Sequence, residues 1–300
     1  MLKRCAIKRI IISTGALLIF FLIYFFPNQN NFSIPEEVIY IEELTLPLYT
    51  IDQNNYVART NIIKKENDDI NYIINVLTKG SINSNYLPSN FYSPIPKDTK
   101  LIDYSLNDGI LKLNFSKELL NVTKEDEEKM LESLIYSLCE LDNVNKIMIF
   151  VENEKLNELP NSKAKLPTVL DKTYGINKVY DIKNIKDTSK TTIYYLSKYD
   201  DELYYVPITK ITNNDEKNYV EIIVNELKTS PIYESNLLSY LNASYELESY
   251  EILENSITLS FNNNLIASLE DKDLVEKVKY SISLSLRDTY NLDNIIINMN

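Results

Sequence analysis

Three pairs of adjacent carboxylates could supply acid–base chemistry in this sequence: Asp68-Asp69, Glu127-Glu128 and Asp200-Asp201. Glycosidic hydrolysis needs two carboxylates that face each other across a cleft, one of them with a raised pKa. Two of these pairs stand where helices are predicted to begin, and the third stands in a predicted turn. Acids at such places stabilise a helix dipole or shape a turn, so we expect structural roles for all three. A module that binds or hydrolyses the cell wall through these surface acids is the alternative.

The composition excludes most other catalytic chemistry. The chain has no histidine, which rules out histidine-dependent triads and metal sites. Cys139 falls in the apolar stripe of a predicted helix, where a small core residue is expected. No glycine-rich phosphate loop and no calcium-loop spacing occurs. We therefore assign no catalytic, cofactor-binding or metal-binding residue, expect no cofactor and predict that the protein is not an enzyme.

The N-terminus carries the signal of a membrane segment. Lys3, Arg4, Lys8 and Arg9 precede the uncharged apolar run Ile10–Phe26, which is at the short end of what spans a bilayer. Positive charge on this flank predicts that the N-terminus stays in the cytoplasm and that the residues after the run lie outside it. A cleaved signal peptide would place those residues outside the cytoplasm as well. We expect a stub and anchor over residues 1–26 and a juxtamembrane linker over 27–43. The formal net charge of −12 argues against nucleic-acid binding.

The rest of the chain reads as a duplication. "LIDYSLNDGILKLNFSKELLN" in the first half matches "LESYEILENSITLSFNNNLIA" in the second, and this match aligns Phe115 with Phe261. Each copy predicts the order β-β-α-β-β-α-β, an α+β domain with two helices packed on one mixed sheet. The predicted domains are residues 44–157 and 191–300. The linker over 158–190 includes a short strand at "KVYDI".

Local signals set the expected elements. Strands are predicted at 46–51, 56–62, 146–151, 191–196, 203–211 and 294–299, and "NDG" predicts a hairpin turn. The first helix is expected to have Asn67 as its N-cap and Gly80 as its C-cap. The stretch "SPIPKDTKL" aligns with "SYLNASYEL", which retains only its apolar positions. We predict that this stretch is a rigid corner with Ile95 buried, and that Phe115 and Phe261 are core residues.

The tyrosines suggest a contact surface. Five of the 23 tyrosines fall within residues 192–206. Tyrosine is favoured both in strands and at protein interfaces, so a strand core and a partner surface are both open. The candidate interface residues are Tyr194, Tyr195, Tyr199, Tyr204 and Tyr205.

Together, "VLTKG", "LPSNFYSPIPKDTKL", "SLNDGILKLNFSKEL" and "VNKIMIFVENEKL" resemble the GerMN domain of sporulation and spore germination proteins. The match is good over residues 70–157 and weaker over 191–300. The resemblance implies a fold similar to ring-building motifs and no catalytic residues. It also implies a role in the channel complex between mother cell and forespore. Cys5 precedes the apolar run, so the lipid-modified cysteine of family members in Bacillus has no counterpart here.

These observations lead to one expected function. The protein should be a single-pass membrane protein whose domains lie outside the cytoplasm, in the intermembrane space during sporulation. We expect a non-enzymatic scaffold for a transenvelope complex, with other sporulation membrane or channel proteins as partners, as a homo- or hetero-oligomer. An extracytoplasmic sensor of a small ligand is a further alternative.

Overall fold

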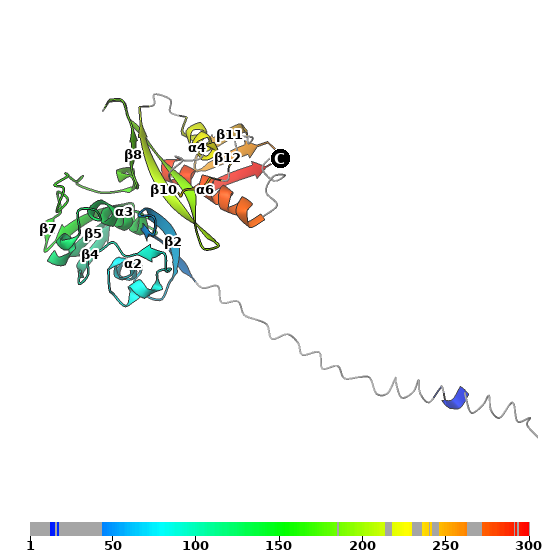
Figure 1. Ribbon diagram of the computed structural model, residues 1–300, viewed down its shortest axis with the longest axis horizontal. Helices are drawn as coiled ribbons and strands as arrows, with labels where there is room; N and C mark the ends of the chain where they lie inside the picture. Colours follow the sequence, from blue (N-terminus) through cyan, green and yellow to red (C-terminus); the bar gives the residue numbers. More distant parts are fainter. Residues whose placement is uncertain are drawn as a thin grey trace, which may run out of the picture. The chain divides into compact units, whose positions relative to one another are not determined.

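The computed structural model (Figure 1) describes residues 13–15, 17, 44–184, 186–213, 218–229, 236–239, 241, 246–262, 272–290, 292 and 294–299. Most of the predicted anchor Ile10–Phe26 and the whole juxtamembrane linker lie outside these residues. No helix in the described part of the chain has the length and apolar character needed to cross a membrane. Residues Glu43–Asn300 form one unit that contains both predicted copies.

One sheet contains the opening hairpins of both copies. The first hairpin consists of β1 (Thr45–Asp52) and β2 (Val57–Ile63), and the second of β9 (Ser189–Tyr199) and β10 (Glu202–Thr212). β2 meets β10 where Arg59 pairs with Tyr205. The sheet order is β3-β1-β2-β10-β8, with β9 also on β10. The expectation of a single separate sheet in each copy is therefore corrected, because these hairpins pair across the copies.

Two shorter strands complete this sheet. β3 (Phe91–Tyr92) pairs with β1, and β8 (Val179–Asp181) runs parallel to β10. β8 confirms the short strand predicted at "KVYDI". The predicted linker thus contributes a strand to the shared sheet.

Each copy has a second sheet, and equivalent strands pair in the same register in the two copies. The first contains β4 (Leu101–Asn107), β5 (Ile110–Phe115), β6 (Lys146–Val151) and β7 (Glu154–Lys155); the second contains β11 (Leu247–Leu253), β12 (Ser256–Phe261) and β13 (Asn294–Met299). In both sheets the hairpin is antiparallel and the last long strand returns in parallel. A register shift follows Leu101 in one copy and Leu247 in the other. The shared irregularity supports the duplication inferred from sequence.

Within the described ranges, four longer helices lie where apolar periodicity predicted them. They are α2 (Asp69–Leu77), α3 (Glu127–Leu138), α4 (Tyr219–Lys228) and α6 (Lys272–Tyr290), and single 3-10 turns cover Asn83–Tyr86, Lys117–Asn121 and Lys172–Tyr174. The cap of α2 is Asp68 rather than Asn67, since the Asp68 carboxylate accepts the Asn71 N–H at 3.1 Å. The C-cap is Thr78 rather than Gly80. Gly80 lies two residues further on with φ +74°, a left-handed conformation that suits glycine.

The predicted core residues lie at the centre of the packing. Ile95, Phe115 and Phe261 are fully buried. The corner around Ile95 is held by the backbone: its N–H donates to the Leu77 carbonyl, and its carbonyl accepts the Lys79 N–H, both at 2.9 Å. The corner therefore closes the end of α2 and inserts one side chain into the core.

Replacing Ile95 with aspartate should destabilise the protein by about 3 kcal/mol, since Ile95 is fully buried among apolar side chains and a carboxylate there would lose its hydration. Lys97→Ala is the matched control, because Lys97 is exposed two residues away. Urea unfolding followed by circular dichroism measures both variants. An Ile95→Asp protein as stable as Lys97→Ala would mean that the corner is not packed as described.

Candidate functional site

The first acidic pair, Asp68-Asp69, makes structural contacts at the start of α2. Asp68 caps the helix and accepts the Tyr104 hydroxyl at 3.0 Å, and Asp69 forms an ion pair with Lys64 at 2.7 Å. Burial raises the pKa of Asp68, but hydrogen bonds from Asn71 and Tyr104 outweigh that effect and lower the pKa below its usual value. Asp68 is therefore ionised at neutral pH and poorly suited to act as a general acid.

The other two pairs also have structural partners. Glu127 accepts the backbone N–H groups of Asn161 and Ser162 at 2.8 and 2.9 Å, and Glu128 forms an ion pair with Lys178 at 2.6 Å. Asp200 lies in the β9–β10 turn with φ +51°, beside the exposed Asp201. In the described parts of the chain, then, the first pair caps a helix, the second binds the segment after β7, and the third lies in a turn. These are the structural roles expected from their positions.

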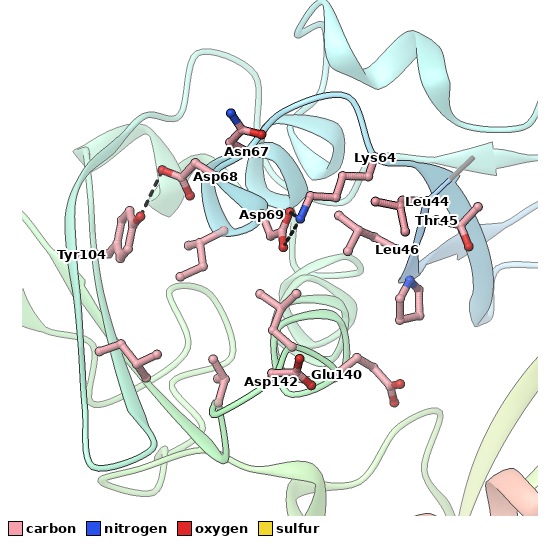
Figure 2. Close-up of a pocket in the computed structure, with 15 residues that line it drawn as sticks. Leu44, Thr45, Leu46, Lys64, Asn67, Asp68, Asp69, Tyr104, Glu140 and Asp142 are labelled. Atoms are coloured by element: carbon pink, nitrogen blue, oxygen red, sulfur yellow. Dashed lines mark hydrogen bonds and ion pairs between the residues drawn. The ribbon is translucent and has the colours of Figure 1, made fainter. Parts of the chain in front are cut away.

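A surface recess of about 690 Å³ lies beside the first pair (Figure 2). Its walls come from the start of β1, the start of α2, strand β4 and the loop after α3. In Figure 2 the Tyr104 hydroxyl reaches Asp68 from one side, and Lys64 bridges to Asp69 on another. The recess thus combines an apolar lining with carboxylates at its rim.

Three of the five candidate interface tyrosines are buried inside the chain. Tyr194, Tyr195 and Tyr204 belong to its core, whereas Tyr199 and Tyr205 are partly buried. This burial corrects the expectation of a partner surface for the first three, because side chains without exposure cannot meet another protein. Tyr204 instead donates to the buried Asp52 carboxylate at 2.8 Å, so it joins the second copy to the first.

Tyr194 meets its counterpart from the first copy, Tyr49, at the junction between the copies. The two hydroxyl oxygens are 2.9 Å apart. Their backbones are held alike: the Tyr49 N–H donates to Ser137 of α3 at 2.8 Å, and the Tyr194 N–H donates to Ser285 of α6 at 2.9 Å. Each copy therefore presents the same tyrosine from the same strand–helix contact.

Charged side chains surround this tyrosine pair. Glu140 follows α3 and Asp288 lies near the end of α6, and Lys172 of the linker contacts both carboxylates, at 2.6 and 2.8 Å. Arg287 contacts Glu140 at 2.6 Å, and Tyr194 donates to Asp288. Burial raises the pKa of Glu140, but Lys172 and Arg287 outweigh it and hold the pKa below its usual value. We call Tyr49, Tyr194, Glu140, Asp288, Lys172 and Arg287 the junction cluster.

The linker fastens the copies at a second point. The Asn177 side chain accepts the Val57 N–H at 2.9 Å and donates to the Val57 and Pro207 carbonyls, both at 2.8 Å. Its backbone N–H donates to the buried Glu132, which also pairs with Lys178 at 3.0 Å. One amide therefore bonds to both hairpins of the shared sheet.

Sequence reasoning missed the junction cluster, although a signal for it existed. The equivalent contacts of Tyr49 with Ser137 and of Tyr194 with Ser285 make Tyr49 the counterpart of Tyr194 and, three residues after each serine, Glu140 the counterpart of Asp288. The sequence of both copies has an acidic residue three positions after a serine of the long apolar helix, and this repeat would have suggested a shared contact.

Known proteins resemble this chain over the residues that form the two copies. Residues 47–157 match the family model described as "Germane: Sporulation and spore germination". The chain is 30% identical over 258 residues to the spore germination protein GerM of Bacillus subtilis (strain 168), an alignment that covers 84% of this chain and 70% of that protein. It also resembles the solved tandem GerMN domains of the sporulation protein GerM from Bacillus subtilis, with a TM-score of 0.78 and 27% identity. That alignment covers 86% of this chain and 91% of the solved one.

Glu140→Gln should destabilise the protein by about 3 kcal/mol at pH 7, because Lys172 and Arg287 would lose a buried partner. The folded pKa of Glu140 lies below the unfolded value of about 4.3, so its contribution is present above pH 4.3 and is lost as the pH falls through the folded pKa. Urea titrations from pH 6 to pH 3 should therefore show a flatter acid-induced loss in the variant. Exposed Glu248→Gln is the control; an equal slope for wild type and Glu140→Gln would contradict the pairing.

The tyrosine pair should show direct coupling. Tyr49→Phe and Tyr194→Phe each remove one hydroxyl, and a double-mutant cycle should give a coupling free energy of about 1 kcal/mol. Tyr180→Phe, at an exposed position, should change the stability little. Additive effects of the two substitutions would mean that the hydroxyl groups do not interact.

Proposed function

Because this chain belongs to the GerM family of sporulation and spore germination proteins, we propose that it is a non-enzymatic scaffold that supports assembly of a transenvelope complex during sporulation. Family membership supports a role in sporulation or spore germination. The scaffold role, the complex and its partners go beyond that role.

The observation that carries the proposal is the joining of the two copies. They share one sheet through β2 and β10, and a buried cluster of ion pairs and tyrosine hydroxyls closes the junction. A buried pair is costly to break, so the copies should keep one relative orientation. A fixed orientation suits a protein that holds partners at a set geometry.

Strand edges provide surfaces for such partners. Among the described residues β4 and β11 each pair on one side only, and both are exposed over most of their length. Unpaired edges are ready to accept another strand. The scaffold would thus offer one edge from each copy.

The location of the scaffold is part of the same proposal. The basic flank and apolar run at the N-terminus support an anchor with the domains outside the cytoplasm, in the intermembrane space during sporulation. Sporulation membrane proteins or channel components are the partners that this location would make available.

The wall-hydrolase alternative receives no specific support. Its candidate acids cap helices, dock the linker or pair with lysines. The relatives are named as germination and sporulation proteins rather than as enzymes.

Crosslinking in sporulating cells tests the scaffold role. A tagged full-length chain should capture membrane proteins of the sporulation envelope, and the tagged Glu140→Gln variant should capture fewer of them at equal abundance. Tagged Glu248→Gln is the control. Muropeptide release by purified wild-type protein, lost when Glu127, Glu128, Asp200 and Asp201 become amides, would overturn the proposal in favour of an enzyme.

A further inference from the structure

Strand β4 is an exposed edge that carries apolar side chains. It is the end strand of the order β4-β5-β6-β7, and within the described residues it pairs only with β5. Ile102, Tyr104 and Leu106 are 49%, 37% and 39% exposed. Proteins usually shorten, charge or cover such an edge, so an open apolar one indicates an interaction surface.

The exposed side chains continue a buried face. Tyr104 pairs across the hairpin with Leu113, and Leu106 pairs with Leu111; both β5 leucines are fully buried. Partners across an antiparallel pair lie on the same side of the sheet. The apolar face that is buried at β5 therefore extends one strand further to β4, where no described residue buries Tyr104 and Leu106 to the same extent.

The recess of Figure 2 lies along this uncovered face. Tyr104 and Leu106 form one wall, and Leu46, Ile70 and Val144 contribute apolar lining from other elements. A strand laid beside β4 would continue the sheet, and every second side chain would point to this side. The geometry provides a main-chain edge together with room for alternate side chains.

Charge at the recess selects the occupant. Asp68, Asp69, Glu140 and Asp142 line it, against a single lysine, Lys64. Lys64 pairs with Asp69, and Glu140 pairs with Lys172 and Arg287. Among the described residues Asp68 and Asp142 have no basic partner within ion-pair distance, so the rim favours basic side chains.

The chain's own preceding segment does not match this charge. Residues 27–43 lead into Leu44 at the recess and contain Glu36, Glu37, Glu42 and Glu43 but no lysine or arginine. Like charges would oppose its binding at the acidic rim. We therefore look for an occupant of opposite charge in another protein rather than in this segment.

We propose that the free edge of β4 and the adjoining recess bind an extended segment of a partner protein, which adds as a strand and places alternating apolar and basic side chains toward the recess. This inference rests on the proposed scaffold role and names the chemistry of one partner contact. Backbone hydrogen bonds to β4 supply affinity, and the acidic rim selects lysine or arginine.

The second copy supplies a matched control position. Tyr250 and Ile252 of β11 pair with the buried Leu259 and Ile257, as Tyr104 and Leu106 do with β5. Counted from the equivalent serines Ser137 and Ser285, Asp142 corresponds to Tyr290, so the second copy lacks that rim carboxylate. A basic peptide should therefore distinguish Leu106 from Ile252.

Fluorescence polarisation with the full-length chain tests the proposal. The probe is a labelled octapeptide, Val-Ser-Lys-Ser-Val-Ser-Lys-Ser, whose valines and lysines lie on one face of an extended strand, and the same peptide with glutamate in place of lysine is its charge control. Leu106→Lys should weaken binding of the lysine peptide about tenfold or more, whereas Ile252→Lys should leave it nearly unchanged. Should Leu106→Lys fail to fold by circular dichroism, exposed Asp142→Lys takes its place, with exposed Asp201→Lys as control.

Peptide N-methylation tests strand addition itself. Alternate N–H groups of a strand point to opposite edges, so methylating one alternate set should abolish binding and methylating the other should not. Equal binding of both methylated peptides, or equal weakening by Leu106→Lys and Ile252→Lys, would overturn the proposal. The proposal would also be overturned if the wild-type chain self-associated and Leu106→Lys abolished that self-association, because the edge would then bind a second copy of the chain.

The outcomes separate this inference from the scaffold role. Failure of peptide binding with intact crosslinking in cells would remove the β4 site and leave the scaffold. Specific peptide binding with muropeptide release that depends on the surface acids would keep the site and remove the scaffold.

Discussion

Two buried carboxylates at the junction constrain the rest of the structure. Glu140 and Asp288 lie against Tyr49 and Tyr194, and their side chains are only 6% and 3% exposed, so water solvates their charges poorly. An unpaired carboxylate there would cost several kcal/mol, so a cation must reach both. Lys172 does so from the linker, and its position requires the segment between the copies to pack on the junction rather than extend into solvent. The connection is thereby part of the folded unit.

The shared sheet follows from the same arrangement. With Lys172 held at the junction, the chain continues through Gly175, whose φ of +87° suits glycine, to Asn177, which bonds to β2 and β10. β8 then lies parallel to β10, and the two hairpins become neighbours. Direct pairing of β2 with β10 is limited to Arg59 and Tyr205. Few backbone hydrogen bonds therefore join the two hairpins, and contacts of side chains and of the linker supply the rest of the junction. Polar contacts thus determine how two similar units join.

The elements were predictable from sequence because their signals are local. Apolar periodicity located α2 and α3, the "NDG" turn located β4–β5, and comparison of the copies placed Phe115 opposite Phe261. Alternation in a strand gives its two faces but not its neighbours, so the pairing of hairpins across copies was missed. For the same reason the strand pattern indicates Tyr194 and Tyr195 as candidates for a partner surface, because no local signal distinguishes a face buried by the other copy from a face exposed to solvent. The cap at Asp68 was missed by one residue because Asn67 and Asp68 are both good caps.

Joining the copies by their first hairpins leaves β4 and β11 paired on one side only within the described residues, and such edge strands carry a risk of self-association. β4 has Asp103 and β11 has Glu248 and Glu251 among their exposed residues, beside the apolar Tyr104 and Tyr250. Two such edges would bring carboxylates together, and like charges directly opposite each other destabilise a strand pair. The acidic side chains therefore disfavour pairing between copies of this chain while leaving the backbone edge open. An edge protected in this way still accepts a basic strand, so charge rather than shape would decide what the scaffold holds.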